Sequence, residues 1–157
     1  MHSQGDARME EQVVIFNLQD QVYGINIESV LEIIRMESVT RVPGTPDFIE
    51  GVINLRGKVI PVMDLSKRFN MPQSRVSSTT RVIIVEAGGV TVGMVVDAVS
   101  EVLRFPVTSI EPPPPMISGA GIEALRGIAL VDGRLIILLD LGRVLHEEEK
   151  ESLQDIG

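Results

Sequence analysis

The hydrophobic positions of this chain fall into short runs that alternate with polar turns. VVIFNL and VYGINI flank a polar turn at residues 19–21, which predicts two strands of a hairpin. GVINLRG and KVIPVMDL predict a second pair of strands, joined tightly at Arg56-Gly57. Between the pairs, residues 28–34 place four apolar side chains on one face and two glutamates opposite. That spacing predicts a helix of about two turns.

The same order of elements returns later in the chain. Residues 51–69 match 127–145 at an offset of 76, and residues 13–34 match 82–103 at an offset of 69. Recurring pairs include Gly24 with Gly93, Glu32 with Glu101, Gly51 with Gly127, Gly57 with Gly133 and Asp64 with Asp140. Similarity at a fixed offset indicates an internal repeat. We expect a residue found in both copies to serve the repeated unit, whereas one that differs is free for another role.

Short strands, tight turns and little helix predict a mainly β fold of two small barrels. A barrel of about 60 residues is marginal alone, so we expect one folding unit with two lobes and a groove between them. The predicted domain spans residues 12–146, with lobes at about 12–72 and 80–146 and a polar connector between them. Residues 1–11 and 147–157 are expected to be flexible tails.

The two copies differ most in the loop that precedes the second GVINL-like segment. It runs from Leu103 to Gly127 and holds four consecutive prolines at 112–115. A stiff spacer is favoured over a polyproline ligand, because no basic residues flank the run. The GAGIEA segment at 119–124 resembles part of a dinucleotide fingerprint, but no βαβ context surrounds it. It is interpreted as a flexible loop.

Composition narrows the classes of function. The chain has 157 residues, a net charge of −8 and a pI near 4.7, which argues against binding to nucleic acid or to an anionic membrane surface. There is no cysteine, so disulfides and thiolate chemistry are excluded. No apolar run reaches the length of a membrane span, and the N-terminal segment lacks a secretory signal. We expect a cytoplasmic protein.

The inventory for catalysis is small. The two histidines, His2 and His146, lie near the chain ends, so neither a catalytic triad nor a histidine metal site is expected. Asp64 and Asp140 could form an acid–base pair, but each follows a strand and precedes a short helix, where an aspartate caps free N–H groups. The sequence therefore predicts no enzyme, no catalytic residue, no metal site and no cofactor.

Arg56 differs from its counterpart in the second copy. The second copy has Asp132-Gly133 at this turn, a favoured pair for a two-residue hairpin, whereas the first has Arg56-Gly57. Turn chemistry does not explain an arginine there. Arg56 is either an indifferent exposed side chain or a contact residue, since arginine is enriched at interface hot spots.

PDFIEGVINLRG at residues 46–57, followed by VIPV at 59–62 and Asp64-Leu65, resembles the CheW family of bacterial chemotaxis coupling proteins. VGMVVDAVSEVL and GRLIILLDL extend the resemblance, which covers about residues 12–146. It implies two SH3-like five-stranded β-barrels without catalytic activity. It also implies two partners, the regulatory domain of the histidine kinase CheA and the cytoplasmic tip of chemoreceptors. The protein would then sit at membrane-associated arrays, reaching the membrane only through receptors.

The resemblance also assigns candidate contact residues. Val30 and Ile33 from the first lobe, with Val99 and Val102 from the second, are implied to lie at the receptor groove, and Arg56 to contact the receptor. Glu32 and Thr40 are implied partner contacts, for either the kinase or the receptor. The second lobe is the expected kinase surface, and the resemblance also implies assembly into rings with the CheA regulatory domain.

Two other functions stay open. One is an adaptor for a non-flagellar array that governs pili, gliding or a second messenger. The other is a small β-barrel protein that binds or hydrolyses a ligand. An ordered His146 beside a carboxylate in a closed pocket would favour the latter.

Overall fold

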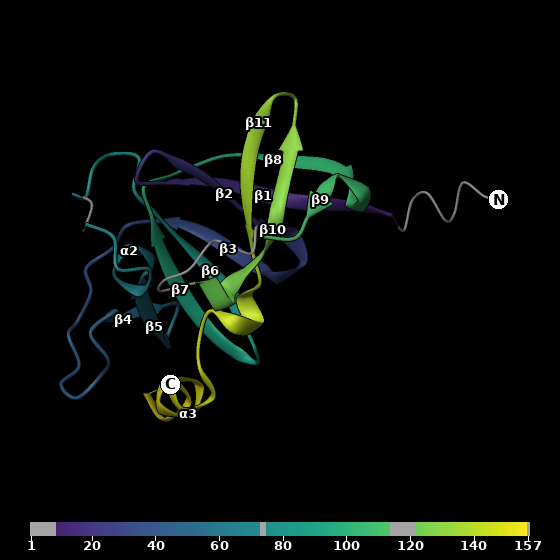
Figure 1. Cartoon of the computed structure of the whole chain (residues 1–157). Helices are drawn as coiled ribbons and strands as arrows, with labels where there is room; N and C mark the ends of the chain where they lie inside the picture. The colour runs from purple at the N-terminus through teal and green to yellow at the C-terminus, as the bar shows by residue number, and fades with distance from the viewer. Residues whose placement is uncertain (1–8, 73–74, 114–121, 157) are drawn as a thin grey trace.

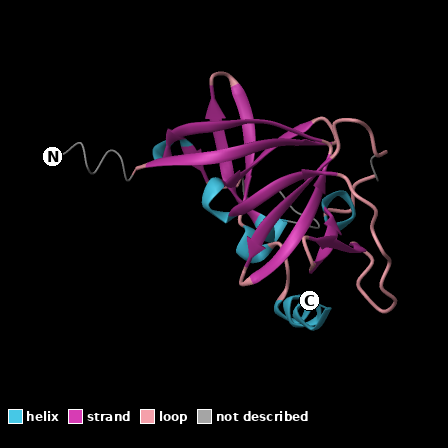
Figure 2. Cartoon of the chain, turned by 180° about the vertical axis from the view of Figure 1, so that it is seen from behind, coloured by secondary structure: helices cyan, strands magenta, loops and turns pink. Residues whose placement is uncertain are grey.

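The computed structural model describes residues 9–72, 75–113 and 122–156, and within these ranges the chain is mostly strand (Figures 1 and 2). The strands are β1 (Glu10–Leu18), β2 (Gln21–Asn26), β3 (Val30–Arg35), β4 (Ile49–Leu55), β5 (Lys58–Asp64), β6 (Arg81–Ala87), β7 (Val90–Val96), β8 (Ala98–Pro106), β9 (Ile110–Glu111), β10 (Leu125–Val131) and β11 (Arg134–Leu139). The helical segments are η1 (Ile27–Ser29), α2 (Leu65–Arg68), η2 (Val107–Ser109), η3 (Ile122–Ala124), η4 (Leu141–Arg143) and α3 (Glu147–Ile156). The predicted mainly β fold is confirmed.

Four hairpins of the described chain share one kind of turn. Both central residues of each turn have positive φ, the geometry of a type I′ turn, which suits the right-handed twist of the flanking strands. The pairs are Gln19 (53°) and Asp20 (65°), Arg56 (51°) and Gly57 (87°), Gly88 (62°) and Gly89 (89°), and Asp132 (52°) and Gly133 (78°). Arg56 therefore occupies a backbone conformation that is uncommon for residues other than glycine.

The strands form two mixed sheets, and each sheet takes strands from both halves of the chain. One has the order β8-β1-β2-β11-β10-β9 and is called barrel A; the other has the order β3-β6-β7-β5-β4 and is called barrel B. The first hairpin of each copy is thus exchanged into the barrel that holds the later strands of the other copy. The expected lobes at about 12–72 and 80–146 do not coincide with the barrels for this reason. Barrel A has a sixth strand because β9 pairs with β10.

The pairing register repeats between the barrels. Val62 of β5 lies opposite Gly93 of β7 in a parallel pair, and Leu138 of β11 lies opposite Gly24 of β2. Leu138 follows Val62 by 76 positions and Gly93 follows Gly24 by 69, the two offsets of the sequence repeat. The internal repeat is therefore also a repeat of strand register.

Three apolar clusters form the core. Barrel A encloses Val13, Ile15, Phe105, Ala129, Ile136 and Leu138, and barrel B encloses Ile53, Ile60, Val62, Val82 and Ile84. A larger central cluster joins strands of both barrels, including Phe16 and Tyr23 from barrel A and Ile83 and Met94 from barrel B. The phenyl ring of Phe16 stacks on Tyr23 with 5.6 Å between ring centroids. The barrels therefore share buried apolar surface.

The predicted helix over residues 28–34 is wrong. Only η1 is helical there, and β3 begins at Val30 and pairs with β6. A register shift between Val30 and Glu32 lets the apolar residues mimic helical spacing along a bulged strand. The β-branched side chains of Val30, Ile33 and Ile34 favour a strand once β6 is available as a partner.

The ends of the domain also differ from expectation. Strand β1 begins at Glu10, inside the segment expected to be a tail, and Glu11 is buried and paired with Arg126. Residues 147–156 form α3, whose Leu153 is buried in the central cluster. Because mostly charged and polar residues surround Leu153 in the sequence, the pattern typical of an amphipathic helix is weak in this segment. Residues 114–121, which hold the end of the proline run, lie outside the described residues, as does His2.

Candidate protein-interaction site

Arg56 and Glu32 form an ion pair at one end of barrel B. Arg56 lies in the β4–β5 turn and Glu32 in β3, and both guanidinium Nη atoms donate to the Glu32 carboxylate, Nη1 at 3.0 Å. The hydrogen bond to Arg56 lowers the pKa of Glu32, and the same bond raises the pKa of Arg56. The Arg56 side chain remains 72% exposed, so its remaining donors face solvent. The two candidate contact residues therefore form a single site.

Barrel A has a corresponding ion pair. Glu101 of β8, the counterpart of Glu32, accepts a hydrogen bond of 2.9 Å from Nη1 of Arg134 at the start of β11. Arg134 is the counterpart of Lys58, not of Arg56. The glutamate is thus shared by both copies, while the arginine comes from different positions of the hairpin.

The four apolar candidate receptor residues divide into two kinds. Val30 and Val99 occupy equivalent positions, and both are half-buried against the central cluster. Ile33 and Val102 are also equivalent, and they are 41% and 49% exposed. The structure therefore leaves Ile33 and Val102 as the apolar side chains that a partner can reach directly.

The backbone of Thr40 has a structural role. Its backbone N–H donates to the carbonyl of Val52 at 2.9 Å, and its carbonyl accepts from the Val52 N–H at 2.8 Å. This bridge joins the chain beyond β3 to β4 and helps to close barrel B. The side chain of Thr40 is exposed. A partner contact by that side chain stays a prediction.

A hollow of about 840 Å³ lies at the same end of barrel B. Its lining includes Glu32 and Arg56 together with Leu31 and Val59, which are 56% and 48% exposed. Neither Leu31 nor Val59 is among the contact residues expected from the sequence. Along β3 the exposed Leu31 alternates with half-buried neighbours, which is a signal for the solvent face, whereas β5 shows no such alternation around Val59.

A family model described as a CheW-like domain matches residues 12–149. The chain belongs to the CheW-like family. It is 37% identical to the chemotaxis protein CheW of Klebsiella aerogenes over 94% of this chain and 89% of that protein. It is 34% identical to Protein FrzA of Myxococcus xanthus over 94% of this chain and 92% of that protein. The crystal structure of the scaffolding protein TtCheW from Thermoanaerobacter tengcongensis matches with a TM-score of 0.83 and 43% identity, covering 91% of this chain and 97% of that one.

As a CheW-like chemotaxis adaptor the chain is a scaffold and not an enzyme, and the suspected catalytic groups have structural roles. Asp64 accepts from the backbone N–H groups of Ser66 and Lys67 and so caps α2, and Asp140 caps η4 in the same way through Gly142. Burial raises the pKa of Asp64, and the nearby charge of Glu50 adds to that rise. His146 is 48% exposed with Nε2 at 3.6 Å from Glu123, a surface contact rather than a closed pocket.

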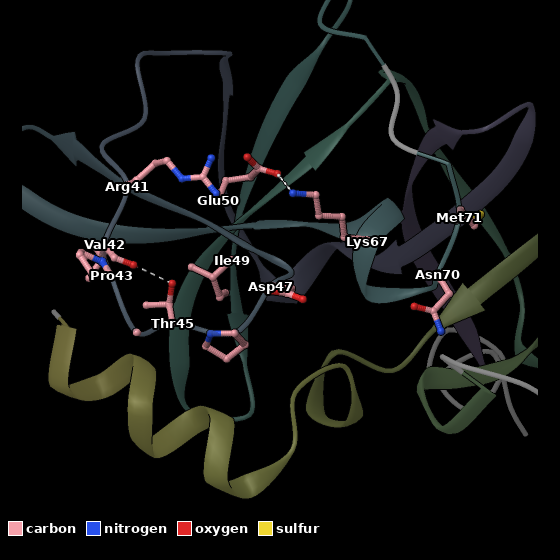
Figure 3. A pocket seen from close by; sticks show the side chains of 12 residues that line it. Arg41, Val42, Pro43, Thr45, Asp47, Ile49, Glu50, Lys67, Asn70 and Met71 are labelled. Carbon is pink, nitrogen blue, oxygen red and sulfur yellow. Dashed lines mark hydrogen bonds and ion pairs between the residues drawn. The ribbon is translucent and has the colours of Figure 1, made fainter.

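A second hollow of this CheW-like fold, of about 750 Å³, lies beside α2 (Figure 3). Its lining combines polar and apolar residues from the loop after β3, the start of β4, α2 and the segment that follows α2. Within it, Lys67 pairs with Glu50 at 3.3 Å, and Thr45 donates to the carbonyl of Val42 at 2.9 Å. Lys67 and Glu50 thus compensate each other's charge. In the described residues no group of three or more histidines and carboxylates is placed to hold a metal ion, and no helix is long and apolar enough to cross a membrane.

Proposed function

We propose that this chain couples chemoreceptors to the histidine kinase CheA. The observation that carries the proposal is the arrangement at the end of barrel B in a chain of the CheW-like family. There the exposed side chains of Leu31 and Val59 line the same hollow as Glu32, and Glu32 holds the exposed guanidinium of Arg56. An arginine beside exposed apolar side chains is typical of an interface hot spot.

The receptor tip is the proposed partner of this surface. Its contacts would be Ile33, Val102 and Arg56, with Val30 and Val99 supporting them from the central cluster. Glu32 would act through Arg56. The kinase would engage another part of the molecule through its regulatory domain, and rings of the two would follow if both barrels are used. The protein would work in the cytoplasm at receptor arrays, touching the membrane only through receptors.

The mechanism would be geometric. Two partners bind one rigid body, so a shift of one partner changes the position of the other, and binding energies are coupled. The shared central cluster supports this view, because it packs strands of both barrels against each other.

Co-purification with the CheA regulatory domain, with and without a receptor-tip fragment, tests the proposal. We expect a binary complex with each partner and a ternary complex with both. Absence of both binary complexes from a folded sample contradicts the proposal. A second candidate is an adaptor of another array, for pili, gliding or a second messenger, and the similarity to FrzA favours keeping it. Binding to tips of a different receptor set, with no binding to chemotaxis receptors, would select that candidate.

A further inference from the structure

Two leucines lie exposed at the tip of the β10–β11 hairpin. Leu130 and Leu135 are 61% and 64% exposed, and they lie opposite each other across the hairpin, so their side chains share one face. Ile137 lies two residues after Leu135 on the same face and packs against the central cluster. Figure 1 shows this hairpin projecting from the body of the molecule. The leucine pair therefore extends apolar surface from the core into solvent.

The internal repeat indicates what kind of segment covers such a surface. The counterpart of Leu135 in barrel B is Val59, which lines the same hollow as Leu153 and Gln154 of α3. Helix α3 packs there through Leu153, whose side chain is buried. In the first copy, the residues that would correspond to α3 lie in the connector to β6. Within residues 75–80 the structure has no helix, so no counterpart of α3 from the described chain covers barrel A.

Charges at the tip of barrel A are mainly negative. Because β2 and β11 are parallel neighbours, the turns that precede them lie at the same end of the barrel, and these turns carry Asp20 and Asp132. Arg134 is paired with Glu101 at 2.9 Å and adds no free positive charge. An apolar surface with an acidic rim suits an occupant that has apolar and basic side chains.

We propose that the face formed by Leu130 and Leu135 is a docking site for a basic amphipathic α-helix of a partner protein. The helix would lie on barrel A as α3 lies on barrel B, with apolar residues on the leucine pair and lysine or arginine toward Asp20 and Asp132. This surface is separate from the end of barrel B that holds Arg56, and it goes beyond the proposed receptor and kinase contacts.

A labelled amphipathic peptide of leucine and lysine, about 14 residues long, tests this site, with a leucine–glutamate peptide as the charge control. We expect the lysine peptide to bind the full chain and to slow hydrogen exchange in β10 and β11. The double change Leu130→Asn and Leu135→Asn should weaken binding about tenfold or more. Val59→Asn, the counterpart change in barrel B, is the matched control and should leave binding unchanged. If the double variant unfolds, Leu130→Asn alone serves, because the first copy carries Asn54 at that position.

Three kinds of result would overturn the proposal. The first is equal binding of the lysine peptide to the wild type and to a folded leucine variant, which would indicate general attraction to an acidic protein. The second is protection at sites other than the hairpin, or equal binding of the glutamate peptide. The third is self-association that the leucine changes abolish, which would make a second copy the occupant. Arg56→Asp should retain peptide binding even though it is expected to lose receptor binding. A failure of the docking proposal can therefore be told apart from a failure of the proposed receptor coupling.

Discussion

Arg56 and Glu32 form a two-point ion pair that ties the β4–β5 turn to β3 across the end of barrel B. The counterpart of Glu32 makes the same kind of tie in barrel A, from Glu101 to Arg134. A glutamate at this position therefore belongs to the repeated unit. Arg56 does not recur, and it occupies a turn in which the second copy has the better suited aspartate. The asymmetry between the two turns is what points to a contact role for Arg56.

Arg56→Asp should weaken receptor binding without harming the fold. The change copies Asp132-Gly133, a favoured pair for a type I′ turn, so the turn itself is preserved. The exposed ion pair with Glu32 contributes little to stability because solvent screens it. We expect an unchanged unfolding midpoint by circular dichroism and loss of binding to a receptor-tip fragment. Asp132→Arg in barrel A is the matched control, and retention of tip binding by Arg56→Asp would remove Arg56 from the site.

Val102→Asp should weaken binding to the receptor tip more than binding to the kinase domain. The side chain is 49% exposed, so a charge there meets solvent in the free protein and a desolvated apolar surface only in the complex. Val99→Asp is less informative, because Val99 packs against the central cluster and its loss would disturb folding. Pull-down with each partner measures the difference. Val76→Asp, at a position 65% exposed in the connector, is the control that should change neither. Equal loss of both partners would contradict the assignment.

Gly51→Ala should strongly destabilise the domain. A Cβ built at Gly51 would lie 2.1 Å from the carbonyl oxygen of Thr40, and the residue has φ of 149°. The crossing chain could not keep its two hydrogen bonds to Val52 without moving. Urea unfolding should show a loss of roughly 2–4 kcal/mol, toward the upper end for an overpacked site. Gly57→Ala, with open space around it, should cost about 1 kcal/mol from backbone strain alone. A similar cost at both positions would show that the Thr40 crossing can relax.

Asp64 should make the stability depend on pH. Burial raises its pKa above the ordinary value of 3.8, so the folded protein holds this proton more tightly than the unfolded chain does. This contribution to the free energy of unfolding is fully present below the ordinary value and is lost as pH rises through the raised pKa. Asp64→Asn keeps a capping side chain but does not titrate. The free energy of unfolding of Asp64→Asn should therefore increase relative to that of the wild type as pH rises from about 4 to 8. Asp140→Asn is the control, and a constant difference across this range for Asp64→Asn would refute the prediction.

Leu153→Ala should loosen α3. Leu153 is 1% exposed and is an apolar side chain through which α3 reaches the central cluster. Removing a buried leucine costs about 2–5 kcal/mol. Hydrogen exchange should accelerate in residues 147–156 before other segments, and the free energy of unfolding should fall. Gln154→Ala, which changes an exposed neighbour, should leave both unchanged, and an unaltered exchange rate in Leu153→Ala would show that α3 is held mainly by Arg68–Glu149 and Lys150.

The repeat made much of the fold predictable, because hairpins, capping aspartates and turn glycines each have local signals. The exchange of hairpins between copies was not predictable. A hydrophobic pattern with period two is the same whether β2 pairs within its own copy or with β11. The helix expected at 28–34 failed because a bulge near Leu31 imitates helical spacing. The partnership of Arg56 and Glu32 joins residues 24 positions apart, and only the closure of barrel B brings them together.

The exchange of hairpins has a mechanical consequence. The strands pass from barrel A into barrel B after β2 and return after β7, so two covalent crossings between strands and a shared central cluster connect the barrels. If one flexible linker joined two separate halves, a movement of one half would not be passed on to the other. Here the two barrels move together as one body. Whatever grips one end therefore sets the angle at which the other end is presented.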